Sequence, residues 1–190
     1  MDNDTPEFHV SELDEAWALA LAEAEQRARA AGRTDISAYL ALRTSNDLLR
    51  KTGRDWLQET FAVVVAKANR AGAGIKVSRE DAHRFKVGNA TMVGIRLSLV
   101  RGVRTLLVEV GWPRTPRDGF IRGGGLACAN IKHLGIKSAS EQLRLVVDAS
   151  GIPRWKVETH GTDAAEIHKA NIRDHIAILI NDSRNQPPRS

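Results

Sequence analysis

Cysteine is scarce in this sequence, with Cys128 the only one among 190 residues. One cysteine cannot form an intrachain disulfide, which is typical of proteins in a reducing compartment. Long apolar runs are also lacking. Every apolar run, including residues 61–66, is far shorter than the roughly 20 residues of a membrane-spanning helix. The acidic start, residues 1–4, lacks the basic and apolar regions of a secretory signal. We therefore expect a cytoplasmic protein that does not interact with membranes.

Short motifs that indicate a particular reaction or a bound metal are absent as well. The sequence contains no G-x-S-x-G, no H-E-x-x-H and no G-x-G-x-x-G. His168 and His175 lie two helical turns apart, which is too far to share a metal ion, and Cys128 sits in an apolar run typical of a buried thiol. We expect no metal and no cofactor, and nothing in the sequence directly supports catalysis.

Helical patterns dominate the first 74 residues. Ser11 is followed by three acids within the next four positions, and the pattern continues to a stop at Gly32. Two further helices are predicted over residues 35–50 and 54–71, separated by Gly53. Residues 1–10 are expected to form a flexible lead-in.

Alternating apolar residues replace the helical period after residue 74. The clearest hairpin pairs residues 91–100 with 103–112 around Arg101-Gly102. That register places Glu109 opposite Gly94 and diagonal to Arg96. One face then carries a continuous apolar set: Val93, Ile95, Leu97, Leu99, Leu106, Val108, Val110 and Trp112.

The remaining pattern completes an α+β fold. Short strands are possible at 75–77 and 84–87, and a third long strand is predicted over 120–133 with Gly123-Gly124-Gly125 as a bulge or bend. A second hairpin joins 141–148 to 152–158, and an Asp163-to-Glu166 capping box opens a last helix. We predict one domain over 11–180, with a helical part (11–74), an antiparallel meander of four to six strands (75–158) and a closing helix (162–180). A disordered tail (181–190) follows.

Charge is unevenly distributed along the chain. Residues 1–31 hold eight acids and two bases, whereas residues 32–137 hold nineteen bases and eight acids. A basic middle is typical of proteins with an anionic partner. The alternative is that these bases simply form solvated faces.

A basic, glycine-rich stretch of the chain is the leading candidate for binding. Arginine offers a planar fork for phosphate, glycines let backbone N–H groups approach it, and an aromatic ring can stack a base. We hypothesise a non-catalytic binding module for an anionic ligand such as nucleic acid, with these ligand-binding residues in region 101–125: Arg101, Arg104, Arg114, Arg117, Phe120 and Arg122. A solvated hairpin loop is the competing interpretation.

Two other hypotheses remain open. A ligand pocket with enzymatic potential could use the polar face of the sheet, with Glu109 as general base beside Arg96 and Asn130. The simpler interpretation of that face is a surface ion pair between Arg96 and Glu109. Alternatively, the acidic first helix could pair with a basic sheet edge, within one chain or in a homo-oligomer, which would make the protein an interaction module.

Overall fold

The computed structural model describes residues 19, 22–24, 26–158 and 165–181, with backbone only at Pro116 and Arg122. The chain divides into two compact units, Met1–Leu48 and Leu49–Ser190. Within the described part of the first predicted helix, residues 19, 22–24 and 26–30 are helical, and a turn at 31–32 follows. The predicted lead-in and the tail from residue 182 lie outside the described residues.

The second and third predicted helices form one continuous helix, α2 (Thr34–Arg70), so the predicted break at Gly53 is wrong. Gly53 costs roughly 1 kcal/mol of helix propensity relative to alanine. The Gly53 carbonyl nevertheless takes part in tertiary packing, because it accepts a hydrogen bond from the Trp155 indole Nε1–H at 2.8 Å. No described helix is long and apolar enough to cross a membrane.

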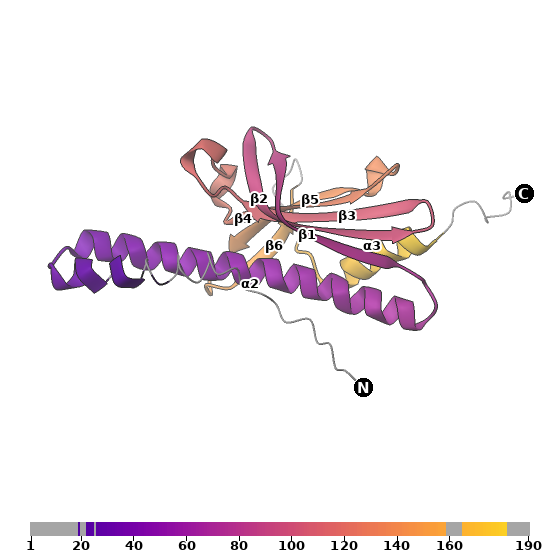
Figure 1. Ribbon diagram of the computed structural model, residues 1–190, viewed down its shortest axis with the longest axis horizontal. Helices are drawn as coiled ribbons and strands as arrows, with labels where there is room; N and C mark the ends of the chain where they lie inside the picture. Colours follow the sequence, from indigo (N-terminus) through magenta and orange to yellow (C-terminus); the bar gives the residue numbers. More distant parts are fainter. Residues whose placement is uncertain (1–18, 20–21, 25, 159–164, 182–190) are drawn as a thin grey trace, which may run out of the picture. The chain divides into compact units, whose positions relative to one another are not determined.

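Six antiparallel strands follow in a meander, each hydrogen-bonded to the next in chain order (Figure 1). This confirms the predicted α+β class and sets the strand number at the upper end of the expected range. The strands are β1 (Lys76–Val87), β2 (Ala90–Arg101), β3 (Arg104–Trp112), β4 (Ala127–His133), β5 (Glu141–Val147) and β6 (Pro153–Val157).

The hairpin of β2 and β3 forms with a register shifted by two residues from the prediction. Arg101 pairs with Arg104, so the loop consists of Gly102 and Val103. Gly102 has φ 58° and occupies the first central position, where type II′ hairpin turns favour glycine. Because side chains alternate with a period of two, this shift leaves every residue on its predicted face. It does change one pair, since Glu109 lies opposite Arg96 rather than Gly94.

The two short strands considered for 75–87 are one long edge strand, β1. Its pairing with β2 is irregular between Glu80 and His83, where β1 contains one extra residue. Ala82, inside this irregularity, has φ 54°. The extra residue places Glu80 and His83 on the same face of the sheet, although three positions along a regular strand would place them on opposite faces.

The predicted third strand over 120–133 is shorter than expected, because β4 begins only at Ala127. Before it come two short 3-10 helices, η1 (Pro116–Asp118) and η2 (Arg122–Gly124). Gly123 and Gly124 have φ 73° and 75°, which a strand does not accommodate. A third 3-10 helix, η3 (Lys137–Ala139), connects β4 to β5. All four ends of the β5–β6 hairpin lie within one residue of the prediction.

The last helix, α3 (Lys169–Ile180), begins later than predicted. Its N-cap is His168, whose backbone N–H donates to the Asn171 side chain at 3.0 Å. Glu166 does not belong to a helical turn but forms a bridge with Lys156 of β6. Asp163, the other end of the predicted capping box, lies outside the described residues.

One face of the sheet carries the hydrophobic core. Residues of α2 (Leu57, Phe61, Val65) and α3 (Ile172, Ile176, Leu179) are buried against it. Both helices therefore cover the same face of the meander. Seven of the eight apolar residues assigned to that face in β2 and β3 belong to this core, and Val93 is half-buried. We call the opposite face, which carries Arg96 and Glu109, the outer face.

Gly53→Ala tests the close packing of α2 on the sheet. An alanine Cβ at this position would lie 2.6 Å and 2.7 Å from the two methyl carbons of Leu145, which is fully buried. Although Gly→Ala normally stabilises a helix, we expect the free energy of unfolding to fall by about 1–3 kcal/mol because of overpacking. In the double variant with Leu145→Ala, the new methyl should fill part of the cavity. Urea denaturation should then give a loss smaller than the sum of the two single losses; additive losses would contradict the close contact.

Candidate functional site

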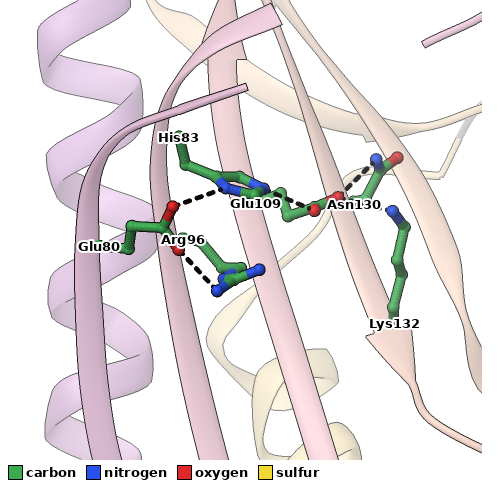
Figure 2. A network of polar contacts seen from close by, with 6 residues as sticks. All are labelled: Glu80, His83, Arg96, Glu109, Asn130 and Lys132. Carbon is green, nitrogen blue, oxygen red and sulfur yellow. Dashed lines mark hydrogen bonds and ion pairs between the residues drawn. The ribbon is translucent and has the colours of Figure 1, made fainter. Parts of the chain in front are cut away.

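A network of polar side chains crosses the outer face of four neighbouring strands (Figure 2). Each strand from β1 to β4 contributes. The contacts join β1 to β2, β1 to β3 across β2, and β3 to β4. The residues are Glu80, His83, Arg96, Glu109, Asn130 and Lys132.

Glu109 is the centre of this network and is only 6% exposed. His83 Nε2 lies 2.9 Å from Glu109 Oε1. Asn130 Nδ2 and Lys132 Nζ donate to Oε2 at 3.0 Å and 2.6 Å. Both carboxylate oxygens are therefore engaged by neighbouring side chains.

His83 reaches β3 because β2 has no side chain between them. Its partner in the sheet is Gly94, which in turn pairs with Gly111. The backbones here approach so closely that a Cβ on Gly94 would lie 1.9 Å from the Val110 carbonyl oxygen. The two glycines are thus required by the packing, and they leave room for the imidazole to lie across the strand.

The predicted ion pair between Arg96 and Glu109 is replaced by two others. Arg96 Nη2 pairs with Glu80 Oε2 at 2.6 Å, and Glu109 pairs with Lys132. Sequence reasoning missed Glu80, His83 and Lys132. Lys132 lies two positions after Asn130 in the same strand, so the alternation of side chains places both on the same face. Its place could therefore have been predicted from that of Asn130. The other two depend on the β1 irregularity, which no residue pattern indicates.

The chemistry of Glu109 is that of a stable anion. Burial by itself raises the pKa of this carboxyl, but hydrogen bonds from Lys132, Asn130 and His83, together with the Lys132 charge, lower it below its ordinary value. A carboxylate with a lowered pKa and both oxygens engaged is a poor general base. The arrangement favours cross-strand stabilisation of the sheet over proton transfer.

Two histidines form a second polar pair, on the core side of the sheet. His133 of β4 and His175 of α3 are both buried, and Nε2 of the first lies 3.0 Å from Nδ1 of the second. Burial lowers the pKa of His133 to about 4, helped by the charges of His175 and Arg104. Burial also lowers the pKa of His175, against the opposing effect of Glu141 and Asp174.

Arg101 and Arg104, two of the predicted ligand-binding residues, bind the end of α3. Arg101 donates to the Ala73 carbonyl at 2.9 Å and to the Ile180 carbonyl. Arg104 donates to the carbonyls of Ile178, at 2.7 Å, and Asn181. Cations at a helix C-terminus satisfy carbonyls that lack intrahelical partners and complement the helix dipole. Their geometry is that of helix caps.

Asp118 organises the connection between β3 and β4. Its residue is 6% exposed, and its carboxylate accepts hydrogen bonds from the Thr115 hydroxyl and from the backbone N–H groups of Arg114 and Thr115. It also pairs with Arg84 of β1 at 2.8 Å. Burial opposes ionisation, but these hydrogen bonds and the Arg84 charge lower the pKa of Asp118. The connection is therefore fixed to the end of the β1–β2 hairpin.

Exposed bases gather where these two segments meet. We define the basic surface as Arg84, Lys86, Arg114, Arg117 and Phe120, all of which are exposed. Arg84 has a side chain 63% exposed despite its contact with Asp118. The Cζ of Arg114 lies 4.1 Å from the centre of the Trp112 ring, a cation–π contact that orients the guanidinium. Thus two of the predicted arginines lie here, together with two bases that sequence reasoning missed.

The remaining predicted site residue, Arg122, lies in η2 rather than in the strand predicted over 120–133. Cys128 is buried, and burial raises the pKa of its thiol to about 12, which makes it unreactive. Across the described ranges, no three histidine, cysteine, aspartate or glutamate side chains are placed to hold a metal ion.

Comparison with known proteins gives no match: no family model, no curated protein and no solved structure is similar to this chain.

Glu109→Gln tests the role of the outer-face network. The amide keeps the size of the carboxylate but replaces one acceptor by a donor facing other donors. We expect the free energy of unfolding at neutral pH to fall by about 1–3 kcal/mol, the range for loss of charge-assisted hydrogen bonds at a buried site. Glu80→Gln is the matched control, since its side chain is 48% exposed, and it should cost less than about 1 kcal/mol. Urea denaturation of both variants gives the comparison; equal losses would show that burial of Glu109 is unimportant.

The histidine pair predicts a loss of stability in acid. Unfolded imidazoles bind a proton near pH 6.5, whereas folded His133 does so only near pH 4. The unfolded chain therefore holds more protons between these values, and the free energy of unfolding should fall as pH is lowered through this window. His133 should account for on the order of 3 kcal/mol of this fall.

His133→Gln should make the pH dependence of unfolding shallower between about pH 6.5 and 4. His168→Gln is the control, because that histidine is exposed at the N-cap of α3. It should keep the dependence of the natural chain. If both variants keep it, the buried pair does not determine acid stability.

Proposed function

We propose that the protein is a non-catalytic module that binds nucleic acid through the basic surface. The single observation that carries this proposal is that the contact between Arg84 and the buried Asp118 joins two basic segments. Residues 84–91 and 113–126 together contain five bases and one acid. That acid is Asp118, which is buried and already paired, so the surface presents positive charge to the solvent.

The chemistry of the bases supports a phosphate ligand. Arg114 and Arg117 carry planar guanidinium groups, which bind phosphate oxygens with two parallel hydrogen bonds. Lys86 adds a point charge at the end of the β1–β2 hairpin. Arg101 and Arg104 are not part of the proposal, because they bind the carbonyls at the end of α3.

The number of bases sets the expected salt dependence. About four phosphate contacts should make the logarithm of the association constant fall with a slope near −3 to −4 against the logarithm of salt concentration. Affinity should therefore fall roughly 100-fold between about 50 mM and 200 mM NaCl. A ligand recognised mainly by apolar contacts would lack this dependence.

Replacing Arg114 and Arg117 together by alanine tests the proposal. We expect affinity for a short labelled oligonucleotide to fall about tenfold or more, and the salt slope to become shallower by about two, because two phosphate contacts are lost. Fluorescence anisotropy at two salt concentrations measures both quantities. Thermal unfolding should change little, since both side chains are exposed.

The matched control removes the same charge elsewhere. Lys169 and Arg173 are exposed on α3, and their joint replacement by alanine should leave affinity within about twofold of the natural chain. Equal weakening by the two double variants would mean that only net charge matters. Absence of binding at low salt would overturn the proposal outright.

A further inference from the structure

Phe120 presents an apolar ring in the middle of a charged region. It is 81% exposed, and within the described side chains of residues 84–91 and 113–126 it is the only large exposed hydrophobic one. A phenylalanine that leaves its ring in water forgoes the free energy of burial. Its surroundings are basic rather than apolar, so the ring does not belong to a hydrophobic patch of the kind that forms the centre of protein interfaces.

The backbone on both sides of Phe120 is anchored. Two residues before it, the Asp118 carboxylate binds Thr115 and Arg84. Gly119, with φ 84°, lies so close to Ala90 that a Cβ would be 3.3 Å from its methyl group. One residue after it, Ile121 is half-buried. It packs against the core and against a second, smaller cluster of buried residues: Phe85, Ala90, Met92 and Cys128. The exposed ring is thus held out by a fixed turn.

A fixed aromatic ring among phosphate-binding groups matches the chemistry of an unpaired nucleotide. Each nucleotide of a single strand carries one phosphate for the bases and one planar face for the ring. In a duplex the bases are already stacked on one another, so a ring outside the helix does not reach them. We infer that Phe120 stacks on an unpaired base, and that the ligand of the basic surface is therefore single-stranded nucleic acid.

This inference rests on the proposed function, and the two can be separated by choice of ligand. Three labelled probes of about twelve residues are sufficient: oligothymidylate, the same strand without bases, and the matching duplex. The strand without bases keeps the phosphates and removes only the stacking partner. Anisotropy titrations at low salt then compare the natural chain with Phe120→Ala and Phe120→Trp.

We expect Phe120→Ala to weaken binding of oligothymidylate roughly 5- to 100-fold, the effect of losing one base–aromatic stack. Binding of the strand without bases and of the duplex should stay within about twofold of the natural chain. Phe120→Trp should retain or strengthen binding of oligothymidylate, because indole has a larger stacking face.

Two results would overturn the inference and leave nucleic-acid binding intact. In the first, all three probes depend on Arg114 and Arg117, but Phe120→Ala behaves as the natural chain. In the second, Phe120→Ala weakens all three probes equally, which would indicate a contact with the backbone. If no probe binds at low salt, the proposed function fails together with the inference. The exposed Phe120 ring would then indicate a protein partner instead.

Discussion

The pairing of β2 with β3 determines where almost every other residue of the sheet lies. Gly102 closes the hairpin, and the register that follows aligns Arg96 with Glu109 and Gly94 with Gly111. The sheet continues from this pair of strands to β1 on one side and to β4, β5 and β6 on the other. The same register sends one set of side chains into the core beneath α2 and α3, and the alternate set to the outer face.

Periodicity predicted the parts of the fold that depend on burial. The α+β class, the meander and the core face followed from apolar alternation, which a shift of two residues does not disturb. The break at Gly53 was wrong because helix propensity is weak compared with tertiary packing. Here Leu145 lies against Gly53, and Trp155 donates to its carbonyl. The hydrogen bond between Trp155 and Gly53 joins residues about a hundred positions apart, and no local sequence pattern reveals it.

The candidate site was predictable only where it is continuous in sequence. Arg114, Arg117 and Phe120 were found because they share one loop. Arg84 and Lys86 were missed because the β1–β2 hairpin meets that loop only in the folded chain, through contacts such as Arg84 with Asp118. The sequence does not distinguish an arginine that faces water from one that caps a helix. Arg101 and Arg104 look like their neighbours until α3 is folded against them.

The irregularity in β1 bears on how this protein behaves at high concentration. β1 is an edge strand, so its outer row of backbone groups could in principle pair with a strand from another molecule. The extra residue between Glu80 and His83, with Ala82 at φ 54°, interrupts that row near its middle. Arg79, Glu80 and Asp81 add exposed charges at the same place. The opposite edge, β6, is already paired with residues 165–167. The sheet is thereby protected at both edges against growth into β-aggregates.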